Sequence, residues 1–142
     1  MRFSKVIDFV SDLIMSYEPL LELIGTDRQD YLHLNMVPPE AERPCLVQNF
    51  RFGEYGPESH KVIVLYNLSV WTIEEVAEEC WQIADELQSL FEAEDGTGFF
   101  APAPQFNLSW VRIYTANGAQ MVNTGNRDMK RLDLSYEIHV AR

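Results

Sequence analysis

The sequence contains few of the residues on which small disulfide-bonded and metal-binding domains depend. It has two cysteines, Cys45 and Cys80, with no Cys-x-x-Cys motif and no pair of histidines at zinc-ligand spacing. These absences argue against a disulfide framework and a structural zinc site. We expect two buried thiols in a reducing compartment, and a single Cys45–Cys80 disulfide stays open as the alternative.

Long hydrophobic runs are also absent. No apolar stretch approaches the roughly 20 residues that a membrane-spanning helix requires. The N-terminal segment does not resemble a signal peptide, because Asp8 and Asp12 interrupt its apolar residues. Glycine and proline are scarce, with seven of each, and 46% of the 142 residues are hydrophobic. We therefore expect one soluble globular domain, covering residues 1–142, that stays in the cytoplasm where it is made.

Basic residues are the scarcest charged class. Eleven Lys and Arg face 22 Asp and Glu, which gives a formal net charge of -11, and residues 62–111 contain no Lys or Arg at all. Such a chain repels phosphates, so general nucleic-acid binding and binding to an anionic membrane are both disfavoured. The segment 112–142 is the exception, with five basic residues against three acidic ones.

Hydrophobic periodicity predicts alternating helices and strands. Thr72 and Glu75 form a capping box at the start of the best-defined helix, and residues 26–44, 96–106 and 117–126 are expected to be irregular. The pattern predicts a two-layer α+β domain of order α-β-β-α-β-β, with an antiparallel sheet of about four strands packed against two amphipathic helices. The expected elements are a helix at 3–17 with a further apolar turn at 20–24, strands at 45–50 and 60–71, a helix at 73–92, and strands at 108–115 and 131–140.

No group of residues forms a recognisable catalytic or cofactor-binding motif. His33, His60 and His139 are isolated, and there is no nucleophile elbow, phosphate-binding loop or metalloprotease helix. The acidic run that includes Glu78 and Glu79 fits a solvated helix face better than a divalent-ion site, which stays open as the alternative. We expect no enzymatic activity, no bound metal and no cofactor.

Aromatic residues, in contrast, are abundant outside the predicted core. Three large side chains are notable in so small a domain: Trp71, Trp81 and Trp110. Two further aromatic residues, Phe52 and Tyr55, flank the first predicted hairpin. Each alone fits a core position, but together they indicate apolar surface that another chain covers. The open edges of a small sheet also favour pairing between subunits.

The order and spacing of several motifs resemble the tail-completion proteins of tailed bacteriophages, also called tail terminators or head–tail joining proteins. The resemblance covers most of the chain. It rests on the leucine-rich segment 20–25 followed by Asp27-Arg28 and Tyr31, on Pro38-Pro39 and Arg43-Pro44, on Val70-Trp71 before Thr72-Ile73-Glu74-Glu75, and on the closing segment 134–140.

The resemblance implies a structural virion protein. Proteins of this kind form a hexameric ring at the head-proximal end of the tail tube, end tube polymerisation and provide the docking surface for the head connector. The expected partners are five further copies of this chain, the tail tube protein and a neck protein, and DNA passes through the channel without specific binding. The implied location is the tail of the virion, after assembly in the host cytoplasm.

A ring requires a heterologous contact, in which one patch meets a different patch on the next subunit. The C-terminal cations are expected to meet the Glu-rich helix of a neighbour, and contact with DNA stays open as the alternative. Two aromatic residues near the first hairpin are further candidates for the contact between subunits. The candidate interface residues are Arg112, Arg127, Lys130, Arg131, Glu74, Glu75, Glu78, Phe52 and Tyr55. Two alternatives stay open: another ring protein of the phage neck, and a small acidic inhibitor that mimics nucleic acid.

Overall fold

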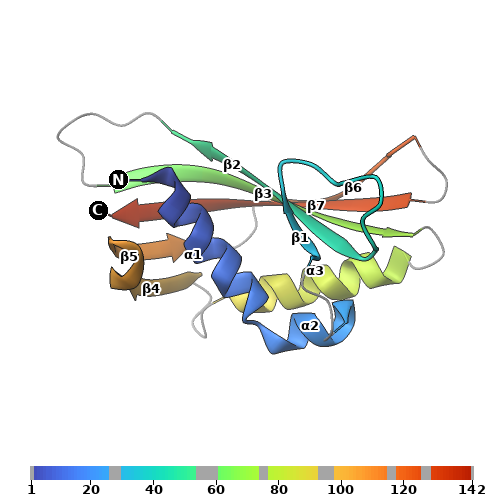
Figure 1. Cartoon of the computed structure of the whole chain (residues 1–142), viewed down its shortest axis with the longest axis horizontal. Helices are drawn as coiled ribbons and strands as arrows, with labels where there is room; N and C mark the ends of the chain where they lie inside the picture. Colours follow the sequence, from blue (N-terminus) through green and yellow to red (C-terminus); the bar gives the residue numbers. More distant parts are fainter. Residues whose placement is uncertain are drawn as a thin grey trace.

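The computed structural model describes residues 2–25, 30–53, 61–73, 77–92, 98–114, 118–125 and 129–141. Within these ranges, three α-helices lie on one face of a seven-stranded sheet and form the second layer (Figure 1). The helices are α1 (Phe3–Met15), α2 (Glu18–Ile24) and α3 (Ala77–Phe91). The strands are β1 (Leu32–Leu34), β2 (Cys45–Phe52), β3 (Lys61–Ile73), β4 (Phe99–Ala103), β5 (Leu108–Ile113), β6 (Gly118–Val122) and β7 (Met129–Ala141).

The two long strands β3 and β7 form the centre of the sheet. The strand order is β1-β2-β3-β7-β5-β4, and β6 also pairs with β7. The outer edge of β7 is therefore shared: residues 131–135 pair with β6, and residues 138–141 pair with β5. All pairs are antiparallel except β1 with β2, which makes the sheet mixed.

The core lies between the helices and one face of this sheet. Alternate residues of β7 are buried there, as the sequence predicts: Leu132, Leu134, Tyr136, Ile138 and Val140. The matching set on β3 runs from Val62 to Val70. The apolar stripes of α1 and α3 complete the core with Val6, Phe9, Val10, Ile14, Cys80, Ile83, Leu87 and Phe91. None of the described helices is long and apolar enough to cross a membrane.

Two buried tyrosines connect the sheet to the helices. The Tyr66 hydroxyl donates to Gln48 Oε1 at 2.8 Å, and Gln48 Nε2 donates to Ser11 Oγ on α1 at 2.7 Å. The Tyr136 hydroxyl donates to Gln88 Oε1 on α3 at 3.3 Å. Burial raises the pKa of both Tyr66 and Tyr136 above the usual value. These phenols therefore remain neutral donors that fix the position of the helices on the sheet.

The sequence-based prediction of about four strands is wrong, because it misses the short ones. The three segments that were expected to be irregular each contain a short strand: β1 lies in 26–44, β4 in 96–106 and β6 in 117–126. Strands of three to five residues are too short to show alternation. Pairing with a longer neighbour stabilises them, and a single sequence does not show that pairing.

The helical predictions also change at two boundaries. Pro19 was expected to break or kink the first helix, and the structure shows a break: Pro19 lies in the first turn of α2, where its missing N–H costs nothing. Thr72, expected to cap the third helix, is a buried residue of β3 whose Oγ1 lies 2.9 Å from Cys80 Sγ. Its capping partner Glu75 lies outside the described residues. Cys45 and Cys80 are both buried and unbridged, which confirms the prediction of buried thiols.

Gly98 and Gly118 provide a matched test of this fold. Gly98 has a φ of +92°, and a Cβ there would collide with the backbone carbonyl of Ile113, whereas a Cβ at Gly118 meets nothing within 4 Å. We expect Gly98→Ala to lower the free energy of unfolding by about 2 kcal/mol or more, and Gly118→Ala to change it by less than about 0.5 kcal/mol. Urea denaturation followed by circular dichroism measures both. Equal effects of the two variants would contradict the β4–β5 geometry.

Candidate interaction surface

One face of the sheet is left uncovered by the helices, and we call it the open face. Because side chains alternate along a strand, it carries the odd-numbered residues of β3 and β7 and their register partners on β2, β5 and β6. Its charged side chains are Arg51, Lys61, Arg112, Arg131, Asp133 and Glu137. Cations therefore gather on this face of a strongly acidic protein.

The helical layer has the opposite charge. Residues of α1, α2 and α3 include eight carboxylates and a single lysine, Lys5. Four of the carboxylates are on α3: Glu78, Glu79, Asp85 and Glu86. The two faces of one molecule are thus electrostatically complementary, which favours head-to-tail association of copies.

Large apolar side chains are exposed on the open face. Ile63, Leu65, Ile73 and Phe100 have exposed fractions between 42% and 54%. Ile63 and Leu65 are neighbours on the side of β3 that faces away from the helices, and Ile73 lies on the same side at the other end of the strand. Groups of exposed apolar residues flanked by charges are typical of surfaces that another chain covers. The sequence predicted an apolar surface made of aromatic residues, and the exposed apolar side chains on this face include aliphatic residues as well.

A cluster around Arg131 occupies one end of the open face. The Arg131 guanidinium bonds both carboxylate oxygens of Asp133 at 2.8 Å and lies 5.5 Å from the ring of Trp71. Ser69 Oγ donates to the same carboxylate at 2.8 Å. The indole Nε1 of Trp71 is buried without a hydrogen-bond partner among the described residues. Arg131 is therefore held within its own chain by a bidentate ion pair and a cation–π contact.

A second cluster around Arg112 occupies the other end. The Arg112 guanidinium lies 5.2 Å from the ring of Phe100 and 5.9 Å from that of Tyr114. Tyr114 packs edge-on against His139, whose Nε2 lies 2.5 Å from Glu137 Oε1. These contacts bury His139 on the open face. The cluster is a stack of rings and ions, with Phe100 as its most exposed member.

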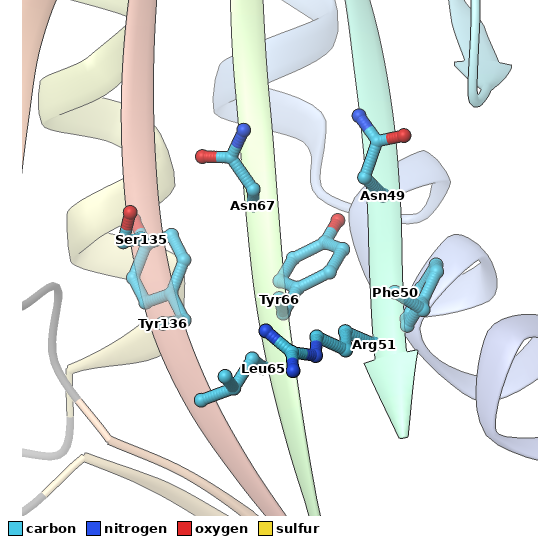
Figure 2. Close-up of a pocket in the computed structure, with 8 residues that line it drawn as sticks. All are labelled: Asn49, Phe50, Arg51, Leu65, Tyr66, Asn67, Ser135 and Tyr136. Carbon is cyan, nitrogen blue, oxygen red and sulfur yellow. The ribbon is translucent and has the colours of Figure 1, made fainter. Parts of the chain in front are cut away.

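A hollow of about 340 Å³ lies between the two clusters along the strands. It is lined by β2, β3 and β7, and Figure 2 shows Asn49 and Asn67 level with each other and Arg51 reaching from β2 toward Leu65. Asn49, Asn67 and Ser135 form one row across the three strands. These uncharged groups can donate and accept hydrogen bonds, but the row has no acid, base or thiol. The hollow therefore fits contact with another chain better than catalysis.

The structure separates the predicted interface residues. Arg131 lies near the start of β7, whereas Arg112 lies on β5 and pairs with His139 near the end of β7. Lys130 points to the helical side, opposite Thr72, and Glu78 is exposed at the start of α3. Phe52 is partly buried against Phe3, with ring centroids 4.3 Å apart, so it contributes to packing within the chain. Arg127, Glu74, Glu75 and Tyr55 lie outside the described residues.

The positions of two surface features could not be predicted from the sequence. One is the pair of sheet edges at β1 and β6: open edges were expected, but not at these strands, because neither strand was predicted. The other is a groove between α3 and β6, lined in part by Trp81, Ala84 and Ala119. An exposed Trp81 on an otherwise acidic helix face was the only signal of this groove in the sequence.

Among the described residues, no three His, Cys, Asp or Glu side chains are close enough to hold a metal ion.

Comparison with solved structures identifies proteins of the same fold. The chain superposes on a chain named "Virion of native gene transfer agent (GTA) particle" with a TM-score of 0.64, covering 94% of this chain and 92% of that one at 14% identity. The likeness is one of fold. A second solved chain, whose name states no function, gives a TM-score of 0.60 at 16% identity, with coverage of 93% and 96%. No family model and no curated protein matches the sequence.

The cluster around Arg131 gives a prediction about stability. Asp133→Asn removes the charge that balances Arg131 but keeps the shape of the side chain. Because both groups are partly exposed, we expect the free energy of unfolding to fall by only about 1 kcal/mol. The loss should shrink in high salt, because ions screen the pair in the parent protein. Asp85→Asn, the same change at an exposed position on α3, is the control. An unchanged stability for Asp133→Asn would mean that the bidentate pair contributes nothing.

Proposed function

We propose that this chain is a structural virion protein that forms a hexameric ring on the head-proximal end of a phage tail tube. The ring ends tube polymerisation, provides the docking surface for the head connector and lets DNA pass through its channel. The observation that carries the proposal is the likeness in fold, over nearly the whole of both chains, to a chain of the gene transfer agent virion. The motifs that resemble tail-completion proteins support the specific position in the tail.

The surface of the molecule supports a structural role and not an enzymatic one. Its open face combines exposed aliphatic groups with cations, and the helical layer opposite is acidic. Such a molecule can associate head-to-tail, and a head-to-tail contact closes into a ring when the rotation per subunit divides the circle evenly. The proposed partners are further copies of this chain, a tail tube protein and a neck protein.

The candidate interface residues are expected to contribute unequally to the proposed contacts between subunits. Lys130, Arg112 and Glu78 remain interface candidates, as do Arg127, Glu74, Glu75 and Tyr55 outside the described ranges. Arg131 contributes less than an unpaired cation would, because its guanidinium already bonds Asp133. Phe52 contributes mainly through the aromatic packing that it shares with Phe3 and Phe50.

The acidic helical layer is the one observation that favours a second function. Eight carboxylates on three adjacent helices, with one lysine, resemble the charge density of nucleic acid and would suit an inhibitor of a DNA-binding protein. The two functions differ in oligomeric state. An inhibitor module acts as a monomer or dimer, whereas a terminator or a neck adaptor forms a ring.

Negative-stain imaging of the purified protein at high concentration tests the proposal. We expect sixfold rings with an open channel, either alone or after addition of tail tube protein. Adding the chain to polymerising tube protein should shorten the tubes and place density at one tube end only. Tubes of unchanged length, together with particles no larger than a dimer, would contradict the proposal and favour the inhibitor. Rings that bind a portal assembly but not the tube would place the protein on the head side of the neck.

A further inference from the structure

Five strands of the sheet lie side by side in the order β1-β2-β3-β7-β6, and we call them the five-stranded band. β1 and β6 form its two opposite edges and lie level with each other. The register pairs His33 with Val47, Val47 with Ser69, Ser69 with Asp133, and Asp133 with Gln120. His33 and Gln120 thus end the same row of side chains. Among the described residues, β1 pairs only with β2 and β6 only with β7.

Neither of these edges has the features that usually prevent pairing with another chain. β1 (Leu-His-Leu) and β6 (Gly-Ala-Gln-Met-Val) contain no Asp, Glu, Lys, Arg or Pro. Edge strands are normally protected by charges, prolines or bulges, and β4 has both Pro102 and a register shift. An uncharged edge at both sides of one band leaves no buried charge if the two edges meet.

The two edges also have complementary shapes. Leu34, at the end of β1, is 45% exposed and lies on the helical side, because its register partner Gln48 bonds Ser11 of α1. On the opposite edge, the groove between α3 and β6 has a volume of about 280 Å³ and includes Ala119 and Leu134 in its lining. Leu34 and these two residues belong to one row across the sheet. A neighbour placed at the same level would bring Leu34 to the mouth of the groove.

The charges beside the edges match as well. Asp30 is exposed and lies two residues before β1. Continuing the strand register places it level with Thr72 and therefore with Lys130 on β7, and alternation puts both side chains on the helical side. Asp30 of one copy and Lys130 of the next would then be separated by a single strand, with their Cα atoms about 10 Å apart. The long Lys130 side chain can span most of this distance toward the shorter Asp30 carboxylate.

We propose that β1 of one copy adds to β6 of the next copy, with Leu34 entering the groove beside α3 and Asp30 facing Lys130. β1 runs parallel to β2 and β6 runs antiparallel to β7, so two copies in the same orientation bring β1 and β6 together as antiparallel strands. The contact is heterologous, and its repetition continues one sheet from subunit to subunit. This inference rests on the proposed ring and names the elements that close it.

Cross-linking with a pair of introduced cysteines tests the register. In the double variant His33→Cys, Gln120→Cys, the two Cα atoms of neighbouring copies should lie about 4.5–5.5 Å apart, within disulfide range. Under oxidising conditions we expect a ladder of covalent oligomers that ends at a closed species on a non-reducing gel. The matched control is His33→Cys, Ser89→Cys, with the second cysteine on the exposed face of α3. Equal cross-linking in the two double variants would overturn the proposal.

Two further sets of variants test the side-chain contacts without altering the core. Leu34→Asp should abolish ring formation in sedimentation velocity, whereas Met15→Asp, at a similarly exposed position on α1, should not. Asp30→Lys and Lys130→Asp should each weaken association about tenfold, and the double swap should restore it. A double swap that associates no better than the single variants would contradict the predicted pair.

The outcomes separate this inference from the function on which it rests. Rings that form and cap tubes without the 33–120 cross-link, and that tolerate Leu34→Asp, would overturn the edge contact and leave the terminator role intact. A cross-link that stops at a dimer would overturn the head-to-tail arrangement. Tubes of unchanged length would contradict the terminator role, whatever the cross-link shows.

Discussion

The antiparallel pairing of β3 with β7 is the interaction on which the rest of the structure depends. Thirteen residue pairs, from Lys61 with Ala141 to Ile73 with Met129, join two strands of equal length. β2 attaches to one side of this pair, β5 and β6 share the other, and the helices cover one face. Every exposed feature described above, from the clusters on the open face to both lateral edges, takes its position from this ladder.

The sequence predicted the parts of the fold that show periodicity over many residues. Alternation from Leu132 to Val140 predicted β7 and its buried side correctly, and the apolar stripe from Cys80 to Phe91 predicted most of α3. Short strands escaped prediction because a tripeptide such as Leu32–Leu34 becomes a strand only through its neighbour. The α+β class was therefore correct, and the number of strands and the mixed character of the sheet were not.

The candidate surface was predictable in kind but not in place. Composition indicated that aromatic and charged groups would contact other chains, and the basic segment 112–142 was visible in the sequence. Which cations are already paired depends on the distance between side chains, and Arg131 bonds a residue only two positions away on its own strand. Cations lie on the sheet and carboxylates on the helices because of strand alternation and register. The register between distant strands cannot be predicted from a local sequence pattern. This separation of charge gives an acidic chain one face with an excess of cations.

The dependence of β6 on β7 has a consequence for the order of events during synthesis. Among the described residues, β7 is the one strand that holds β6 in the sheet, and β3 and β7 are separated by more than fifty residues of chain. Contacts between such distant segments form slowly, because a long loop must close first. The β6 edge therefore cannot be presented until β7 has left the ribosome and found β3. A nascent chain that already contains β1 consequently lacks its β6 edge, so the proposed contact could form at both edges only between finished subunits.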